Sequence, residues 1–405
     1  MTPSEITANA GRRKGDSLRD RSVRMSGPRI LSDLEPSAYT SRKVAVAMSG
    51  GVDSSLAAVL LREAGFDVLG LTMLLWDYQR CGRGRSERGC CDLASADDAR
   101  SVATAAGFPH YTLNLNDEFE HAVIDDFVGS YLSGRTPNPC VRCNTIIKWQ
   151  ALRTRGRALG FDFLATGHYA RIALYPDGSR SLAAGIDMSK DQSYFLWGLG
   201  PDDLAATLFP LGAMTKAETR REALRRNLPT AHRAESQEIC FITDNDYGRF
   251  LAHRLCDTSP APLPLTPGPI LDTAGAVIGT HRGAAHYTVG QRKRLGIARG
   301  RPAYVVRVDA SANTVTVGWK EDLLSRGMEV SGARWGRGFP PSEAFPCTVR
   351  IRYRHPGVRA EARITPRGAT VAFETPQTAV TPGQSAVFYD GDLVLGGGII
   401  ERAIP

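Results

Sequence analysis

A pair of cysteines stands three residues apart in TPNPCVRCNT, the stretch from residue 136 to residue 145. Cys140 and Cys143 follow a proline-rich turn, and their thiolates could act as metal ligands or as nucleophiles. The pair therefore suits half of a zinc site, a redox pair or a sulfur-transfer centre. A zinc site would need a second pair of ligands, and the adjacent Cys90 and Cys91 lack the spacing of a zinc finger. These ten residues leave the choice open.

A second stretch, SGGVDS at residues 49–54, has the residue types of a phosphate-binding loop. It follows the apolar run KVAVAM and precedes a segment with helical periodicity. The two glycines let the backbone turn sharply so that successive N–H groups face an anion, and the following helix adds its positive N-terminus. Ser49 and Ser54 add hydroxyl donors, and Asp53 could hold Mg²⁺ or cap the helix. The order of strand, loop and helix predicts a pyrophosphate site at the carboxyl edge of a parallel sheet.

The loop resembles the signature of the PP-loop ATP pyrophosphatases, which split ATP into AMP and pyrophosphate. Further stretches narrow the resemblance: GRTPNPCVRCN (134–144), LATGHYAR (164–171), KDQSYFL (190–196), ESQEICFI (235–242), and then TPGQSAVFY and LGGGIIE near the C-terminus. In order and spacing they are similar to those of the tRNA-specific 2-thiouridylases, the MnmA family, from about residue 43 to residue 405.

The resemblance implies an enzyme that thiolates uridine 34, the wobble base of tRNA anticodons. ATP, with Mg²⁺, would adenylate the C2 carbonyl oxygen of the uracil, and a cysteine persulfide would then deliver sulfur as AMP leaves. An adenylate is a much better leaving group than a carbonyl oxygen. The wobble base is already unpaired, so extruding it costs little. The implied partners are tRNA and a cysteine desulfurase or sulfur-relay protein, and we expect a monomer.

The resemblance also assigns the site residues. Cys240 would carry the persulfide and Cys143 would be its partner thiol, by a route that passes through a disulfide. The residues expected to contact ATP are Ala47, Met48, Ser49, Gly50, Gly51, Val52, Asp53, Ser54, Met73 and Gly167. The residues expected to contact tRNA are Asn138, Pro139, Cys140, His168, Lys190, Asp191, Gln192, Arg352, Tyr353 and Gln384. From the pattern alone, Met73 is equally well explained as one more apolar residue of a buried strand.

Cys140 departs from the family's best-known form, which has an aspartate there, proposed as a general acid or base. A thiol can move protons, but it is less suited to that role at neutral pH. The substitution also creates three potential thiolate ligands, Cys140, Cys143 and Cys240, which could hold a [4Fe–4S] cluster with one iron open for sulfur. The same thiolation with such a cluster is the alternative to the persulfide route.

The secondary-structure elements that must position these residues follow two sequence patterns, one of alternating strands and helices and one of strands alone. Strands alternate with helices from KVAVAM to FDFLAT, which predicts an α/β domain with a doubly wound parallel sheet of the PP-loop type. After about residue 285, short alternating segments separated by Gly, Pro and Asn predict a small β-barrel. In RIRYRH (350–355) this alternation places Arg350, Arg352 and Arg354 on one face of a strand.

These two patterns divide the chain into four predicted segments. We expect a disordered N-terminal extension over residues 1–42 and an ATP-binding catalytic domain over 43–205. A small central domain over 206–284 would carry the second cysteine, and a tRNA-binding barrel would cover 285–405. Thr215 and Glu218 have the spacing of a capping box at the start of a helix.

The charge and the cysteine content of the chain indicate the kind of partner and the redox environment to expect. The 405 residues carry a formal net charge of +8, which favours an anionic partner such as nucleic acid. Eight cysteines in so long a chain without a signal-peptide pattern favour a reducing cytoplasm, and no apolar run is long enough to cross a membrane. We expect Cys256 and Cys347 to be buried thiols. Cys81, Cys90 and Cys91 fall in a basic loop that could touch RNA or form a separate metal or redox site.

Two other classes of protein explain parts of the sequence. A PP-loop ligase acting on a small-molecule carbonyl would use SGGVDS but leave the cysteines and the basic β domain without a role. A metal-stabilised RNA-binding protein without enzymatic activity would use the cysteines and the charge but not the phosphate loop.

Overall fold

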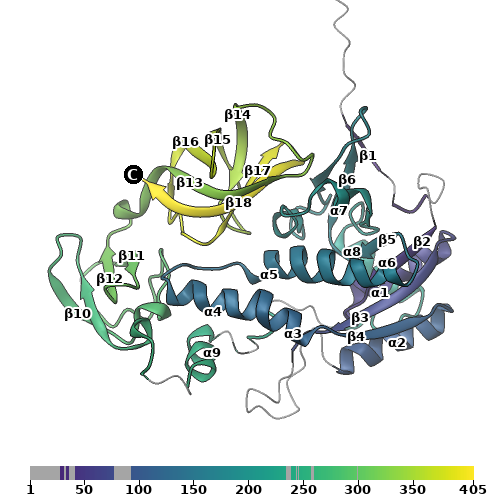
Figure 1. The fold of residues 1–405 in the computed structure, drawn as a ribbon, viewed down its shortest axis with the longest axis horizontal. Coiled ribbons are helices and arrows are strands. Elements are labelled where there is room, and N and C mark those ends of the chain that lie inside the picture. Colours follow the sequence, from purple (N-terminus) through teal and green to yellow (C-terminus); the bar gives the residue numbers. More distant parts are fainter. Residues whose placement is uncertain are drawn as a thin grey trace, which may run out of the picture.

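The computed structural model describes residues 28–31, 33–35, 42–76, 93–233, 239–242, 244, 246–256, 260–298 and 300–405. Within these residues the strands form three sheets, shown in Figure 1. The first is a five-stranded sheet near the N-terminus, the second a four-stranded sheet, and the third a nine-stranded sheet that contains the C-terminal barrel. The predicted fold class is confirmed.

The five-stranded sheet is entirely parallel, in the order β4-β3-β2-β5-β8. Its strands are β2 (Lys43–Ala47), β3 (Asp67–Leu74), β4 (His110–Asn114), β5 (Phe163–Thr166) and β8 (Thr207–Leu208). Alternate residues of β2 point to opposite faces of the sheet and belong to different hydrophobic clusters. Val44 and Val46 belong to the cluster on one face, and Ala45 and Ala47 belong to the cluster on the other face. Both faces are therefore covered, as expected for apolar strands of this kind.

Helices cover the two faces of this sheet. On one face lie α1 (Val52–Glu63), α2 (Leu93–Ala106) and α8 (Lys216–Arg225). On the other lie two helical runs with π-type turns: α3 (Asn116–Phe119), η3 (Glu120–Ile124) and α4 (Asp125–Leu132), and then α5 (Pro139–Arg142), η4 (Cys143–Leu152) and α6 (Arg153–Ala158). The second run spans twenty residues, from Pro139 to Ala158. It includes both cysteines of TPNPCVRCNT, because Asn138 caps it and Pro139 is its first residue.

The C-terminal barrel consists of six antiparallel strands. They are β13 (Leu324–Trp335), β14 (Ala344–Arg350), β15 (Val358–Thr365), β16 (Gly368–Thr378), β17 (Ser385–Asp390) and β18 (Leu393–Ile404). Pairing of β17 with β18 closes it. The hairpin of β6 (Ala170–Leu174) and β7 (Arg180–Ala184) joins the same sheet, because β7 pairs with β18. The N-terminal α/β domain and the barrel thus share one sheet.

The strands before the barrel form a sheet of their own, in the order β10-β9-β12-β11. They are β9 (Gly268–Leu271), β10 (Val277–His281), β11 (Tyr304–Asp309) and β12 (Thr314–Gly318). The predicted boundary at residue 285 would place β11 and β12 in the barrel, but both pair within this smaller sheet. Parallel pairing of β12 with β9 joins strands more than forty residues apart, which no local pattern reveals.

Smaller elements complete the described chain. They are the helices α7 (Pro201–Ala205) and α9 (Tyr247–Arg254) and the 3₁₀ turns η5 (Ser193–Phe195), η6 (Leu263–Leu265), η7 (Ala284–His286) and η8 (Glu321–Leu323). Strand β1 (Arg29–Ile30) pairs with β6, and the Asp33 carboxylate accepts a hydrogen bond from the backbone N–H of Phe209. For these few residues the structure departs from the disorder expected over residues 1–42.

The strand predicted over RIRYRH is wrong beyond its first residue. Strand β14 ends at Arg350, and the chain then turns through residues 351–354. Arg350 and Arg352 therefore do not share a strand face: Arg350 is mostly buried, whereas Arg352 is exposed. Among the described residues, no helix has both the length and the apolar character needed to cross a bilayer.

Candidate active site

The phosphate loop lies between β2 and α1, at the carboxyl edge of the parallel sheet. Gly50 has a φ of +68°, a conformation that glycine adopts without strain. The Ser54 hydroxyl accepts from the backbone N–H of Ser49 at 3.1 Å and donates to the Gly51 carbonyl at 3.2 Å. These bonds fix a tight turn at the N-terminus of a twelve-residue helix, which suits an anion.

Gly167 follows β5 and lies directly against this turn. A Cβ at this position would stand 2.7 Å from both the Asp53 carbonyl carbon and the Ser54 nitrogen, which is closer than real contacts allow. Glycine is therefore required for the backbone of the TGH segment to approach the first turn of α1. The structure thus brings the predicted ATP residues Gly167, Asp53 and Ser54 together.

Asp53 does not cap α1, because the N-cap position is occupied by Gly51 and Asp53 already lies within the first turn of the helix. Its carboxylate instead accepts from the Lys216 ammonium at 2.6 and 2.7 Å, and from the Tyr169 hydroxyl at 2.9 Å. A carboxylate at the edge of a phosphate loop is a suitable ligand for Mg²⁺ bound with ATP phosphates. The residues present therefore fit a magnesium ion, with Asp53 as the protein ligand.

Two cations at the loop were not predicted from the sequence. Lys216 lies at the first turn of α8, and Arg233 donates to the Gly50 carbonyl at 2.9 Å and to the Ser95 hydroxyl at 2.8 Å. Lys216 is 163 residues away from Asp53 in the chain, so spacing gives no direct signal. The capping box of Thr215 and Glu218, which is confirmed, was the one clue to a helix start there.

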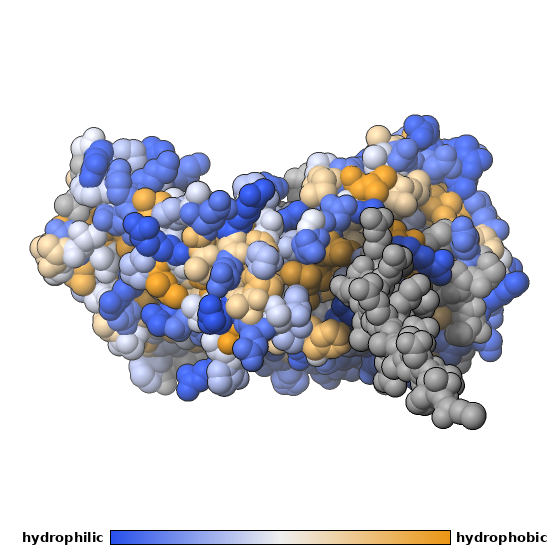
Figure 2. All heavy atoms as spheres, turned by 90° about the horizontal axis from the view of Figure 1, so that it is seen from above, coloured by the Kyte–Doolittle hydropathy of each residue, from blue (hydrophilic) through white to orange (hydrophobic). Residues whose placement is uncertain are grey.

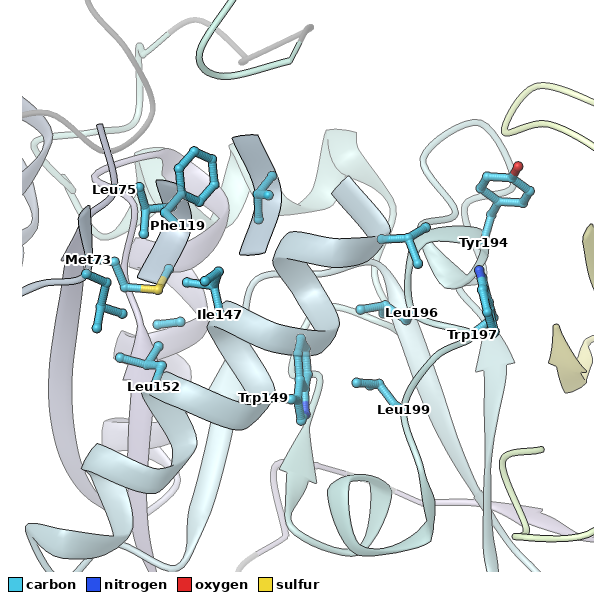
Figure 3. Packing of buried hydrophobic residues seen from close by; sticks show 14 of the residues in the cluster. Met73, Leu75, Phe119, Ile147, Trp149, Leu152, Tyr194, Leu196, Trp197 and Leu199 are labelled. Carbon is cyan, nitrogen blue, oxygen red and sulfur yellow. The ribbon is translucent and has the colours of Figure 1, made fainter. Parts of the chain in front are cut away.

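The Met73 side chain is buried in the core on the helical-run side of the sheet. Figure 3 shows it among Leu75, Ile147 and Leu152, and only 5% of its surface is exposed. This packing accounts for the side chain without a ligand, so any contact of Met73 with adenine would involve its backbone.

Cys143 and Cys240, the two predicted catalytic thiols, pack against the same hydrophobic cluster and are both half-buried. Cys143 begins η4, and the neighbouring Arg142 donates to the Ala122 carbonyl at 3.0 Å. Cys240 is positioned by the next residue, Phe241, which packs edge-on against Phe119 and Phe127 at 5.8 and 5.2 Å between ring centroids.

The described residues give no support to the iron–sulfur alternative. Nowhere in the part of the chain that the structure describes do three His, Cys, Asp or Glu side chains converge as metal ligands, and this includes Cys140, Cys143 and Cys240. Cys81, Cys90 and Cys91 lie outside the described residues. Of the two thiols expected to be buried, Cys347 is buried but Cys256 is exposed, because it lies just past the end of α9.

The segment before Cys140 is docked on a turn of the barrel. The backbone N–H of Thr136 donates to the Pro382 carbonyl at 2.9 Å, and the Gln384 amide donates to the carbonyls of Thr136 and Pro137 at 3.0 and 3.2 Å. Gly383, with a φ of +92°, lets the two backbones meet. Beside this junction lies a cavity of about 480 Å³, which we call the three-domain cavity because the α/β domain, the four-stranded sheet and the barrel all contribute to its lining. The lining includes Thr136, Thr288, Tyr304, Lys320, Arg352 and Gln384.

His168 is held between two partners. One ring nitrogen, Nδ1, lies 2.7 Å from the Thr166 hydroxyl, and Nε2 lies 3.4 Å from the Lys148 ammonium. Because Lys148 can only donate, Nε2 is the acceptor and Nδ1 carries the proton. Burial, and secondarily the Lys148 charge, holds the pKa of His168 well below its usual value. The imidazole is therefore neutral at physiological pH.

The stretch KDQ contains residues with different surroundings. Asp191 is 3% exposed and accepts from the backbone N–H groups of Gly185 and Ser193 and from the Arg350 guanidinium. Gln192 accepts from the Tyr169 N–H at 3.0 Å. Lys190, half-buried, follows a turn capped by Asp187. The Asp191 carboxylate is thus committed within the protein.

Arg352 and Tyr353 follow the end of β14. Arg352 is exposed at the rim of the three-domain cavity, with its guanidinium 3.4 Å from the Thr378 carbonyl. Tyr353 packs on Phe195 at 4.4 Å between ring centroids and is half-buried. Figure 2 shows hydrophilic residues over most of one face of the molecule, with apolar residues gathered along its middle.

Comparison with known proteins places all three parts of the chain. Family models match as the tRNA methyl transferase HUP domain over residues 42–244, the tRNA methyl transferase PRC-barrel domain over 261–319 and the aminomethyltransferase beta-barrel domain over 325–400. The last two ranges agree with the two sheets observed after residue 260.

Curated relatives are similar to this chain over about nine-tenths of its length. The tRNA-specific 2-thiouridylase MnmA of Moorella thermoacetica is 50% identical over 361 residues, covering 88% of this chain and 98% of that protein. The protein of the same name from Geotalea uraniireducens is 48% identical over 368 residues, covering 90% and 96%. Among solved structures, NMN synthetase from Francisella tularensis has 16% identity and a TM-score of 0.32, and covers 54% of this chain and 76% of that one.

Proposed function

This chain belongs to the tRNA-specific 2-thiouridylase family, and from that premise we propose that it catalyses ATP-dependent 2-thiolation of uridine 34 in tRNA. The observation that carries the proposal is the convergence of Gly50, Asp53, Ser54 and Gly167 in one phosphate loop. A loop of this geometry supports the binding of ATP phosphates by backbone N–H groups and hydroxyls. Asp53 would hold the Mg²⁺ that accompanies ATP.

In the first step the C2 carbonyl oxygen of the uracil attacks the α-phosphorus of ATP. The bond from the α-phosphorus to the bridging oxygen breaks, and its electron pair leaves with pyrophosphate. The loop from Ala47 to Ser54 would hold the phosphates in line for this displacement, and the backbone at Met73 and Gly167 would border the nucleoside. The step converts a poor leaving group on C2 into AMP.

In the second step sulfur replaces that AMP. The terminal sulfur of a Cys240 persulfide attacks C2, and the C2–O bond breaks as AMP leaves. The Cys143 thiolate then attacks the Cys240 sulfur, the persulfide S–S bond breaks, and its electrons remain on the sulfur bonded to C2. A Cys143–Cys240 disulfide results, and an external thiol must reduce it. Packing of both cysteines on one cluster supports this pairing.

The target base would lie beside Asn138, Pro139 and Cys140, at the start of the helix that carries Cys143. The docking of Thr136 on the barrel turn at Gln384 supports a role of the barrel in forming this pocket. His168, Lys190, Gln192, Arg352, Tyr353 and Gln384 would contact the tRNA. Asp191, whose carboxylate is committed to Arg350, would act by positioning its neighbours.

The test uses the full chain with ATP, Mg²⁺, cysteine, a cysteine desulfurase or sulfur-relay protein as donor, a thiol reductant and unmodified tRNA. Nucleoside analysis should find 2-thiouridine at position 34, and none with Cys240→Ala or Cys143→Ala. Cys256→Ala, which changes an exposed thiol, should keep the wild-type rate. Product that persists in Cys240→Ala would refute the assigned sulfur carrier. Turnover of ATP on a small carbonyl compound, with no product from any tRNA, would favour a PP-loop ligase instead.

A further inference from the structure

Lys216 is a buried cation at the phosphate loop that the proposed chemistry leaves without a role. It is 8% exposed and lies at the first turn of α8, where its backbone N–H donates to the Asp187 carboxylate at 3.0 Å. The capping box of Thr215 and Glu218 fixes the start of that helix. The side chain therefore extends toward α1 from a rigid base, and its ammonium reaches Asp53.

A purely structural role does not account for this placement. Burying an ammonium is costly, and its pairing with Asp53 at most offsets that cost. The same two helices are already joined at their other ends, where the Arg226 guanidinium pairs with the Glu63 carboxylate at 2.7 Å. The Lys216–Asp53 pair is thus a second link between α1 and α8, and it lies where the loop binds phosphate.

The two partners have competing demands once a nucleotide arrives. Asp53 is the protein ligand suited to a divalent cation, and a carboxylate that turns to a cation gives up part of its bond to an ammonium. ATP brings several negative charges to the same place, and lysine is a common phosphate-binding residue. An ammonium released by Asp53 would be surrounded by acceptors without leaving the site.

We propose that Lys216 is a phosphate-binding residue of the ATP site, held at the loop by Asp53 until the nucleotide binds. With ATP in place, its ammonium contacts the β- or γ-phosphate and stabilises the charge that develops on pyrophosphate as the bond to the α-phosphorus breaks. Tyr169 keeps a hydrogen bond to Asp53 at 2.9 Å and thereby holds the carboxylate when the lysine leaves. This inference rests on the proposed use of ATP.

The first test measures binding of the non-cleavable analogue α,β-methylene-ATP with Mg²⁺ by titration calorimetry, without tRNA. We expect Lys216→Met to weaken binding about tenfold to a hundredfold, the effect of losing a hydrogen bond to a charged group. Arg226→Met is the matched control, since it breaks the other link between the same helices, and its binding should stay within about twofold of wild type. Equal binding by Lys216→Met and wild type would overturn the inference.

A second variant decides the matter if Lys216→Met does not fold. Asp53→Asn leaves the ammonium in place but removes its charged partner. In EDTA, where Asp53 has no metal to hold, this variant should bind α,β-methylene-ATP at least as tightly as wild type. Weaker binding there would mean that the pair is structural. Failure of the wild type to bind the analogue at all would overturn the proposed function together with this inference. If the wild type binds the analogue and Lys216→Met binds it equally well, only the inference about Lys216 is overturned and the proposed function stands.

Discussion

Asp191 of the N-terminal α/β domain and Arg350 of the barrel form an ion pair of 2.8 Å, with side-chain exposures of 1% and 15%. The guanidinium also lies over the ring of Tyr389, 4.4 Å from its centroid, and the Tyr389 hydroxyl is 3.2 Å from that of Ser193. Two domains that share a sheet are thus also joined by a buried charge pair. The Asp191 carboxylate also accepts hydrogen bonds from the backbone N–H groups of Gly185 and Ser193, at 3.2 and 3.0 Å.

Removing one member of this pair should destabilise the protein strongly. Asp191→Ala leaves the Arg350 charge buried without its partner, so the free energy of unfolding should fall by about 3–5 kcal/mol. Urea unfolding followed by circular dichroism measures it. Glu361→Ala breaks an exposed pair on β15 with Arg363 and should change stability by less than about 1 kcal/mol. Equal effects of the two substitutions would show that burial of the Asp191 pair is energetically unimportant.

Gly167→Ala should impair the phosphate loop. The new methyl group would stand 2.7 Å from backbone atoms of Asp53 and Ser54, so the first turn of α1 must shift. We expect a loss of about 1–3 kcal/mol in the free energy of unfolding and weaker binding of α,β-methylene-ATP. Gly129→Ala is the matched control, because that helical position in α4 has open space around it and alanine should stabilise it by about 0.5–1 kcal/mol. Unchanged nucleotide binding in Gly167→Ala would contradict the close approach.

His168 should make stability depend on pH. Above pH 6.5 the imidazole is neutral in both the folded and the unfolded chain. Below pH 6.5 the unfolded chain takes up a proton that the folded chain resists, because burial and Lys148 lower the pKa of His168 in the fold. This contribution to stability is therefore full above pH 6.5 and is lost as the pH falls toward the folded pKa, with a slope of at most about 1.4 kcal/mol per pH unit.

Urea midpoints between pH 7.5 and pH 5 test this effect. His168→Gln should flatten the curve, because glutamine takes up no proton in this pH range. A wild-type curve as flat as that of His168→Gln would show that the imidazole titrates normally.

Local pattern was enough to predict the α/β domain and the phosphate loop. The apolar strand KVAVAM, the two glycines and the periodicity of α1 lie within about twenty residues, and each acts on its immediate neighbours. The same holds for the capping box at Thr215. Family resemblance then supplied Cys143 and Cys240, which no spacing connects.

Features that depend on distant partners were missed. Asp53 looked like a metal ligand or a cap because the sequence does not show Lys216 beside it. Alternation in RIRYRH suggested a continuing strand, but Arg350 turns inward to a buried carboxylate 159 residues away and the strand ends there. Likewise β11 and β12 were assigned to the barrel because their alternation does not reveal which sheet they join.

The cysteines should differ widely in reactivity toward iodoacetamide. Burial raises the pKa of the Cys347 thiol to about 12, so at pH 8 only about one molecule in ten thousand is a thiolate at that position. Cys256 is exposed and open to the reagent. Mass spectrometry of the native protein should show Cys256 alkylated at least about a hundredfold faster than Cys347, and the difference should vanish in urea. Rapid labelling of native Cys347 would mean that the barrel opens readily.

Arg352 should contribute to tRNA affinity through phosphate contact. It is exposed at the rim of the cavity where the three domains meet, and an arginine that neutralises one phosphate releases about one counterion. Arg352→Ala should therefore weaken tRNA binding and reduce the slope of log affinity against log salt concentration by about one. Arg363→Ala, which removes an exposed arginine from β15 elsewhere on the barrel, is the matched control and should leave the slope unchanged. Filter binding between 50 and 300 mM KCl measures the slope for both variants. An identical reduction of the slope in Arg352→Ala and Arg363→Ala would show that the overall charge of the barrel, and not the rim of this cavity, attracts the tRNA.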